Sequence, residues 1–270
     1  MTLLILILAA AGIYYYARYI EPNELQTDEQ NLIVPDSVPE GKIVFFSDTH
    51  FGKLYSEDHL AEIVKTINDQ NPDLVIFGGD LIDNYNRDKS ILNTEKIIEQ
   101  FGQIQSKYGK YAIYGNHDYG GGAELIYKEI MTRSGFTILT NESQGISQMN
   151  LRLTGYDDLL FGYTPASDYS LSGDAFTVIL SHEPDTVDRI TIPSDAVMLS
   201  GHSHGGQVTI PFLTEYYLPD GATEYIRGWY NDKGKSSNID LFVSRGIGMT
   251  TLPFRFLSEP EISVINLVHG

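Results

Sequence analysis

The chain has 270 residues, of which 42% are hydrophobic and 20% charged, a balance typical of a globular protein with a sizeable core. It contains no cysteine, which excludes disulfides, thiolate metal sites and a cysteine nucleophile. The net charge of −18 argues against nucleic-acid partners, because Lys and Arg neutralise phosphate backbones and the chain has 18 of them against 36 acids.

The N-terminal segment is apolar and long enough to cross a bilayer. Leu3 to Ile20 carries one charge, Arg18, and would be about 27 Å long as a helix, close to the hydrocarbon thickness of a membrane. Four tyrosines gather at one end, as aromatic residues do at membrane interfaces: Tyr14, Tyr15, Tyr16 and Tyr19. We predict a single-pass transmembrane anchor over residues 1–20.

Two other interpretations of this segment stay open. A cleaved signal peptide fits less well, because no Lys or Arg precedes the apolar run and the small residues lie inside it. A buried core helix is the third choice, since no amphipathic face is visible. The charges flanking the segment say little about orientation, and we expect the following domain on the extracytoplasmic face of the cell membrane.

Residues 21–41 are polar and contain three prolines, which predicts a linker. One domain is then expected over residues 42–270. Its first half alternates between short apolar strands and helical patterns, in which apolar residues recur at i, i+3, i+4 and i+7. The expected elements are a strand at 42–47, a helix at 56–70 with Ser56 as N-cap, a strand at 74–77, a helix containing Ile97, Ile98, Phe101 and Ile104, and a strand at 111–114.

The second half is richer in strands than the first. Strands are expected at 151–154, 176–180, 196–199, 240–243 and 262–267. Alternating strands and helices followed by further strands indicate a mixed α/β layered domain with two sheets.

Polar motifs follow five of these strands directly. They are SDTH with Asp48 and His50, GGDLID with Asp80 and Asp83, GNHD with Asn116, His117 and Asp118, SHEPD with His182, and GHSH with His202 and His204. Ligands bind at the carboxyl ends of strands in α/β sheets, so the five loops can converge on one place. Five of the chain's seven histidines lie inside these motifs.

The residue types indicate a metal pair. Asp, Asn and His supply hard oxygen and borderline nitrogen ligands, which suit Mn, Fe, Zn, Co or Ni. A central carboxylate can bridge two ions roughly 3.5 to 4 Å apart, as in two-metal hydrolytic sites.

The five motifs in this order resemble the signature of the calcineurin-like metallophosphoesterases. The resemblance extends over residues 42–270 and includes the softer segments HGGQV, SRGIG and LPFRFLSEPEI, which resemble a membrane-associated bacterial subgroup. It implies a four-layer αββα sandwich of two mixed β-sheets, here preceded by the transmembrane helix.

The resemblance also implies roles for the motif residues. Asp48, His50 and His204 would bind one metal, Asp80 would bridge, and Asn116, His182 and His202 would bind the second. His117 would stand over the substrate, stabilising the phosphoryl oxygens or protonating the leaving oxygen, while Asp118 would set its tautomer and orientation. Asp83 would orient a ligand from behind.

The implied enzyme is a membrane-anchored phosphohydrolase with two divalent ions, of which Mn, Fe and Zn fit best. A metal-activated hydroxide would cleave a phosphoester or pyrophosphate bond in a phosphorylated small molecule or a lipid- or nucleotide-linked phosphate. The bilayer is the expected partner of the N-terminal helix, and no protein partner is inferred. The alternative is a non-catalytic metal-binding scaffold of the same fold.

Two further features have open interpretations. The aromatic segment 212–230 is either a wall of the substrate pocket or a packed surface hairpin. Arg227 and Arg245 could touch a substrate phosphate, although structural salt bridges are the favoured interpretation.

Overall fold

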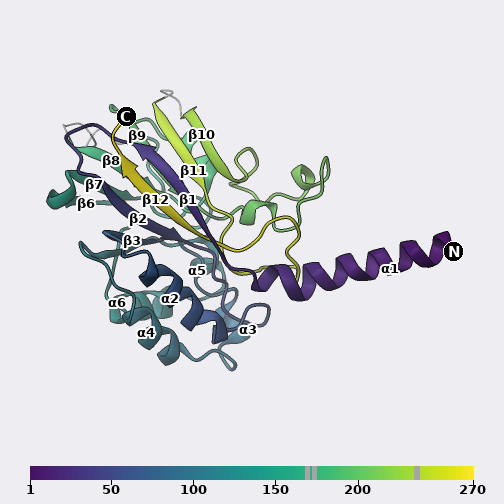
Figure 1. The fold of residues 1–270 in the computed structure, drawn as a ribbon. Coiled ribbons are helices and arrows are strands. Elements are labelled where there is room, and N and C mark those ends of the chain that lie inside the picture. Colours follow the sequence, from purple (N-terminus) through teal and green to yellow (C-terminus); the bar gives the residue numbers. More distant parts are fainter. Residues whose placement is uncertain (168–170, 172–174, 234–237) are drawn as a thin grey trace.

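Two six-stranded β-sheets pack face to face in the computed structural model, with α-helices over the outer face of the first sheet (Figure 1). The structure describes residues 1–167, 171, 175–233 and 238–270. Both sheets mix parallel and antiparallel pairs. The predicted pair of mixed sheets is therefore confirmed.

The first sheet has the strand order β1-β12-β2-β3-β4-β5. Its strands are β1 Gln26–Ile33, β2 Gly41–Phe46, β3 Leu74–Phe77, β4 Lys110–Ala112, β5 Phe136–Ile138 and β12 Glu261–Val268. The β12–β2 pair is antiparallel, and the other pairs are parallel.

The second sheet has the order β10-β11-β9-β8-β7-β6. Its strands are β6 Glu142–Ile146, β7 Leu151–Gly155, β8 Phe176–Leu180, β9 Ala196–Ser200, β10 Gly228–Lys233 and β11 Ile239–Val243. The four central strands are parallel, and each edge strand is antiparallel to its neighbour.

The apolar runs in the sequence are strands that are buried on both faces. Alternate side chains of a strand point to opposite faces of the sheet. In β2, Ile43 and Phe45 therefore enter the core between the sheets, whereas Val44 and Phe46 enter the core beneath the helices. Strands covered on both sides read as continuous apolar sequence, which explains why short runs such as LVIF predicted strands correctly.

Helices cover one outer face, and a thinner layer covers the other. The helices of the domain are α2 Leu60–Asp69, α3 Tyr85–Asp88, α4 Thr94–Gly102, α5 Asn116–Gly120 and α6 Glu124–Arg133. On the second sheet, the 3-10 helix Pro184–Asp188 and neighbouring apolar loop residues cover Ile179 and Met198. Within the described residues, the fourth layer of the predicted sandwich is thus short helix and loop.

The N-terminal helix projects away from the domain (Figure 1). Helix α1 spans Thr2–Tyr15, and helical turns continue it, so that the helical segment runs from Thr2 to Asn23. Only 6% of its most apolar window is buried. The interpretation as a buried core helix is therefore wrong, and the segment has the length and composition of a membrane span.

The segment predicted as a linker contains strand β1. Residues Gln26–Ile33 pair in parallel with Glu261–Val268 along their whole length. Residues 21–41 are therefore not a simple linker, and the folded domain includes residues before Lys42. The sequence did not show this because β1 is a polar edge strand whose partner lies more than 200 residues away, and only Leu32 in it is buried.

Phe101 joins helix α4 to the first sheet and should be a major source of stability. It is fully buried, and its ring lies 5.8 Å from that of Phe46 and 6.3 Å from that of Phe77. Phe101→Ala should destabilise the fold by about 3–5 kcal/mol because it leaves a cavity. Urea unfolding of the detergent-solubilised chain measures this, with exposed Ile91→Ala as the control expected within about 0.5 kcal/mol of wild type. Equal midpoints for the two variants would contradict the prediction.

Candidate metal centre

The five polar motifs converge because they follow strands that are neighbours in the sheets. Strands β2, β3 and β4 are adjacent and parallel in the first sheet, and β8 and β9 are adjacent and parallel in the second. Their carboxyl ends therefore lie along one edge of each sheet. The backbone N–H of His202, after β9, reaches Asp48 Oδ1 after β2 at 3.1 Å, so the two edges meet.

The motif side chains form three groups of atoms that could hold a metal ion. Asp48, His50 and His204 offer ligand atoms within 4.8 Å of one another. Asp80, His182 and His202 form a second such group under the same criterion. The third group is His50, Asp80 and His117, so His117 also lies within reach of a metal ion. The first two groups contain the residues that the resemblance assigns to the two metals, apart from Asn116.

Asp80 lies between the two groups. Its Oδ2 is 3.4 Å from His50 Nε2 and 3.2 Å from His182 Nε2, while its Oδ1 accepts the backbone N–H of His117 at 2.8 Å. Burial alone would raise the pKa of Asp80, but His182, His117 and His50 hold that pKa well below its ordinary value. One ionised carboxylate oxygen thus faces both groups.

Backbone carbonyls fix the orientation of two of the histidines. His182 Nδ1 lies 2.7 Å from the carbonyl oxygen of Gly78, and His202 Nε2 lies 2.8 Å from that of Asp220. A nitrogen that faces a carbonyl must carry the proton, so the other nitrogen of a neutral ring keeps its lone pair. Burial and the neighbouring His182 lower the pKa of His202 to about 4, which keeps the ring neutral at neutral pH.

Several buried polar atoms in this place have no hydrogen-bond partner, and a metal ion would satisfy them. Among the described residues, Asn116 Oδ1 is buried without a hydrogen-bond partner, and His182 Nε2 makes no hydrogen bond although Asp80 Oδ2 lies 3.2 Å away. His204 Nε2 and His50 Nε2 face each other at 3.0 Å. Buried lone pairs that converge beside two carboxylates are what a divalent cation requires, so the residues present fit a metal centre.

Most of the predicted ligands have a strained backbone. Asp48, His50, Asp80, His202 and His204 all have positive φ, between 43° and 67°. Non-glycine residues rarely adopt this left-handed region, and such strain gathers at functional sites that the surrounding fold holds in place. These residues follow β2, β3 and β9, where the left-handed conformation accompanies side chains that face the common centre.

Two motif glycines allow backbones to approach the carboxylates. A Cβ on Gly115 would collide with Asp80, and a Cβ on Gly201 would collide with Asp48. These positions therefore exclude any larger residue. They explain the glycine that begins GNHD and the glycine that begins GHSH.

His117 differs from the other motif histidines because it reaches solvent. Its side chain is 29% exposed, whereas those of His50 and His182 are fully buried. Its Nδ1 lies 2.5 Å from the carbonyl oxygen of Asp83, which leaves Nε2 free to face a substrate. Burial lowers the pKa of His117, but Asp80 and the Asp83 carbonyl outweigh burial and raise it overall.

The predicted contact between Asp118 and His117 is wrong. The Asp118 carboxylate accepts the backbone N–H groups of Asp80, Leu81 and Gly115 at 2.9 to 3.0 Å. Burial and the nearby Asp80 raise the pKa of Asp118 to about 8. Asp118 thus ties the GGDLID loop to the GNHD loop. The sequence misled because Asp118 is adjacent to His117, yet the first turn of α5 directs its side chain to the N–H groups.

Asp83 occupies the supporting position that the sequence predicted for it. Its Oδ1 lies 3.3 Å from His50 Nδ1 and 2.7 Å from the hydroxyl of Thr250, which donates to it. Burial raises the pKa of Asp83, but His50, Thr250 and Arg87 hold it below the ordinary value. A carboxylate behind the ring directs the other nitrogen of His50 toward the centre.

Sequence reasoning missed Arg255. Its guanidinium is fully buried, donates to the carbonyls of Gly248, Ser258 and Arg245, and lies 3.3 Å from His204 Nδ1. It therefore joins the C-terminal loops beneath one of the predicted ligands. The available signal was an arginine between two phenylalanines in the segment LPFRFLSEPEI.

The structure bears on the two arginines and the aromatic segment whose roles the sequence left open. Arg245 pairs with the Glu261 carboxylate, and Arg227 donates to the carbonyl of Leu257, so both are structural. In the aromatic segment 212–230, Tyr225 is buried, whereas Phe212, Tyr216 and Tyr217 are strongly exposed.

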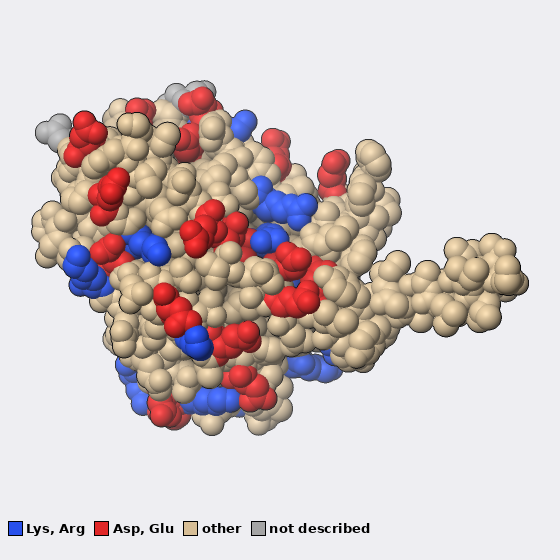
Figure 2. Space-filling view, in the orientation of Figure 1, with Lys and Arg blue, Asp and Glu red and all other residues tan. Residues whose placement is uncertain are grey.

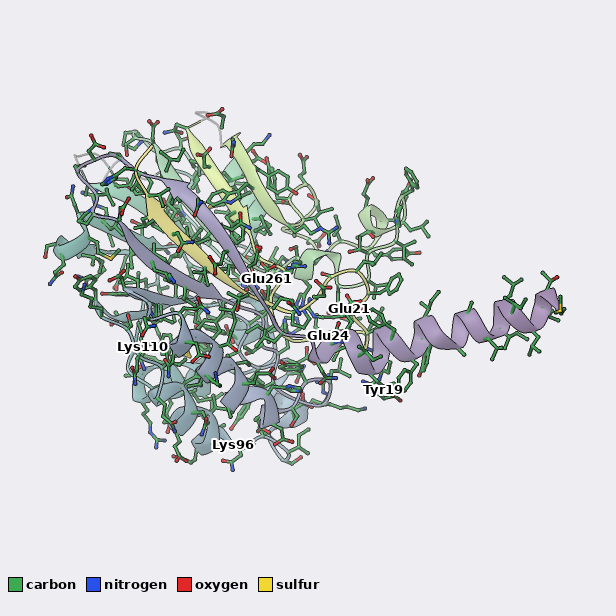
Figure 3. All side chains as sticks on the ribbon, viewed as in Figure 1. Tyr19, Glu21, Glu24, Lys96, Lys110 and Glu261 are labelled. Carbon is green, nitrogen blue, oxygen red and sulfur yellow. The ribbon has the colours of Figure 1, made fainter. Side chains whose placement is uncertain are left out.

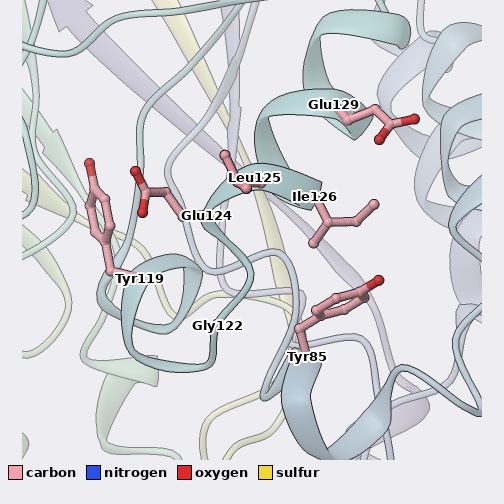
Figure 4. Close-up of a pocket in the computed structure, with 7 residues that line it drawn as sticks. All are labelled: Tyr85, Tyr119, Gly122, Glu124, Leu125, Ile126 and Glu129. Carbon is pink, nitrogen blue, oxygen red and sulfur yellow. The ribbon is translucent and has the colours of Figure 1, made fainter.

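A surface cavity of about 490 Å³ lies beside α5 and α6 (Figure 4). Its lining includes Tyr119 and the acidic residues Glu124 and Glu129, and none of the predicted metal ligands. Acidic walls would repel a phosphate, so we do not assign the substrate to this cavity.

Comparisons with known proteins agree with the motifs. Residues 41–206 match the family model described as calcineurin-like phosphoesterase. The uncharacterized metallophosphoesterase YkuE of Bacillus subtilis is 36% identical, over 96% of this chain and 91% of its own length.

Two further relatives have more descriptive names. The phosphodiesterase YaeI of Escherichia coli is 27% identical, over 97% of this chain and 95% of its own. A zebrafish transmembrane protein with metallophosphoesterase domain is 27% identical over 87% of this chain, which spans about half (54%) of the length of that relative.

Proposed function

Because this chain belongs to the calcineurin-like phosphoesterase family and is a metal-dependent phosphoesterase, we propose that it is a membrane-anchored enzyme that hydrolyses phosphodiester or pyrophosphate bonds. The observation that carries the proposal is the pair of ligand groups that meet at Asp80. The phosphodiesterase name of one relative favours a diester as the bond that is cleaved.

We assign one divalent metal to Asp48, His50 and His204 and a second to Asn116, His182 and His202, with Asp80 bridging. Mn, Fe or Zn suits these oxygen and imidazole donors. When bound, such a pair supplies Lewis acidity to the phosphoryl group and activates a water molecule for attack on phosphorus. The chain's own residues hold the ligands in position through backbone carbonyls, Asp83 and Arg255.

His117 is the proposed catalytic side chain. Its exposed ring stands beside the buried ligands, 4.6 Å from the ring of His50, and the Asp83 carbonyl holds its Nδ1. Nε2 is thus available to stabilise a phosphoryl oxygen or to give a proton to the leaving oxygen. Asp118 supports this arrangement by holding the loops that carry Asp80 and His117.

The proposed anchor is the helical segment Thr2–Asn23, which holds the domain at the membrane. A phosphohydrolase held there would meet lipid-linked or nucleotide-linked phosphates near the bilayer. The domain is proposed to lie on the extracytoplasmic face of the membrane. The chain is also proposed to belong to the membrane-associated subgroup of the family, which the SRGIG and LPFRFLSEPEI segments support.

Removal and return of metal test the proposal. The full chain in detergent, stripped with a chelator, should not hydrolyse a bis-ester, a monoester or a nucleotide-sugar pyrophosphate. Activity toward at least one of the three should return with Mn, because the buried ligands provide no nucleophile without it. The preferred substrate would define the reaction class.

The alternative scaffold function has a distinct outcome. A scaffold would bind two equivalents of metal, measured by elemental analysis, and still hydrolyse none of the three substrates. Asp69→Ala is the control for nonspecific effects of substitution. It should keep the metal content and activity of wild type, because the Asp69 carboxylate pairs with Lys65 on the surface of α2. Metal-loaded wild type without turnover on these substrates or on vesicle lipids would overturn the enzymatic proposal.

A further inference from the structure

Six large apolar side chains are exposed on two loops, one that follows the GHSH motif and one that follows the SRGIG segment. Their side chains are 43 to 88% exposed: Ile210, Phe212, Tyr216, Tyr217, Leu252 and Leu257. We call these six the apolar loop face. Exposed apolar residues that cluster in this way mark an interaction site rather than a random surface.

Hydrogen bonds join the two loops into one unit. The side chain of Gln207 donates to the carbonyls of Thr250 and Leu252, both at 3.0 Å, and accepts the backbone N–H of Thr250. The backbone N–H of Thr209 donates to the carbonyl of Phe256 at 2.8 Å. These bonds hold the HGGQV and LPFRF segments against each other.

The same unit is fastened to the base of the N-terminal helix. The backbone N–H of Arg255 donates to the carbonyl of Ala17 at 3.0 Å. The buried carboxylate of Glu21, at the junction of helix and domain, accepts the N–H groups of Leu257 and Ser258 (Figure 3). The ring of Tyr14 lies 5.5 Å from that of Phe254 in an edge contact.

The loops project to the side of the domain from which α1 extends (Figure 1). In the space-filling view this projection is mostly uncharged, in contrast to the body of the domain (Figure 2). Residues 208–217 and 250–257 contain only two charged residues, Glu215 and Arg255, and Arg255 is buried. The face is thus poor in charge within a strongly acidic chain.

We propose that the apolar loop face docks onto the lipid bilayer that the N-terminal helix crosses. The occupant is a bilayer because the face is continuous with an exposed apolar helix long enough to span one, and because Phe and Tyr suit the interface between headgroups and acyl chains. The inference rests on the membrane anchor of the proposed function.

Docking would hold the metal centre against the membrane. The chain leaves the centre at His204, forms the first loop, and returns at Asp220, whose carbonyl lies 2.8 Å from His202 Nε2. The exposed aromatic residues thus lie between the predicted ligand His204 and Asp220, a residue whose carbonyl contacts the predicted ligand His202. A docked loop would place the site beside the headgroups, where lipid-linked phosphates reside.

Fluorescence quenching by brominated lipid tests this in the full chain. The single native tryptophan, Trp229, is replaced by Phe, and one Trp is placed at Phe212, Tyr217, Leu8 or Ile33. Each variant is reconstituted into vesicles of phosphatidylcholine brominated near the glycerol end of its acyl chains. Ile33 is the matched control, because it is 69% exposed at the far end of β1, about 23 Å from Gln26 by strand length.

Phe212→Trp and Tyr217→Trp should lose fluorescence in brominated vesicles relative to unbrominated ones, whereas Ile33→Trp should not. Leu8→Trp reports on the anchor alone. Quenching of Leu8→Trp with both loop variants behaving like Ile33→Trp would overturn the docking and leave the anchor intact. If Leu8→Trp and both loop variants are unquenched, anchor and docking fail together. Quenched loop variants support docking, even with Leu8→Trp unquenched.

Discussion

Replacing Asp80 with alanine is expected to lower metal-dependent hydrolysis by at least about a thousandfold, which corresponds to roughly 4 kcal/mol of transition-state stabilisation. Asp80 Oδ2 is 3.4 Å from His50 Nε2 and 3.2 Å from His182 Nε2, so one side chain serves both ligand groups. Its loss removes the shared negative charge from the centre. Initial rates of bis-ester hydrolysis and metal content by elemental analysis measure the two consequences.

A neutral isostere separates lost charge from lost structure. Asp80→Asn keeps the shape and can still accept the His117 N–H through its side-chain oxygen, so the fold should persist. Metal content and activity should nevertheless fall, because an amide bridges two cations poorly. Asp69→Ala should match wild type. Asp80→Asn with wild-type metal content and a rate within tenfold of wild type would contradict the bridging assignment.

Replacing His117 with alanine is expected to lower kcat by about 10²- to 10⁴-fold while the metal content stays unchanged. The ring is 29% exposed and its Nδ1 faces the Asp83 carbonyl, so Nε2 carries no proton in the neutral ring and is the nitrogen proposed to act on the substrate. Steady-state kinetics with parallel elemental analysis separate this effect from ligand loss. His269→Ala is the matched control, because that histidine contacts the carbonyl of Val38 near the C-terminus.

The choice of leaving group distinguishes the two roles proposed for His117. A proton donor matters most when the leaving oxygen is basic, so His117→Ala should lose less activity on a nitrophenyl ester than on an alkyl ester. Equal losses on both esters would instead favour stabilisation of the phosphoryl oxygens. A drop in metal content parallel to the drop in rate would show that His117 is a ligand, contrary to the proposal.

The sequence predicted the elements that local patterns specify. Strands at 74–77 and 176–180 have the predicted bounds, and Ser56 caps the helical segment that follows it. These elements are continuous apolar runs or carry a local cap, so their signal lies within a few residues. Strand β1 gave no such signal, because its pairing with β12 is non-local and its composition is polar.

In the candidate site, too, the features set by local sequence could be predicted, and those set by long-range packing could not. That the motif residues come together could be predicted because the motifs directly follow strands, and parallel neighbours bring their carboxyl ends to one edge. The partner of His117 could not, because the first turn of α5 turns Asp118 toward three backbone N–H groups while Asp83 arrives from another loop. Arg255 was equally hidden, since burial beneath His204 depends on the packing of the C-terminal loops.

By itself the sequence determined the chemistry of this protein: an α/β domain, a set of Asp, Asn and His side chains at strand ends, and an apolar N-terminal segment. Only the tertiary structure decided how these parts meet. It holds five of the predicted ligands in left-handed backbone conformations and joins the apolar loop face to the helix through Ala17 and Glu21. Residue type and spacing are local properties, whereas strain and long-range hydrogen bonds exist only when distant segments pack together.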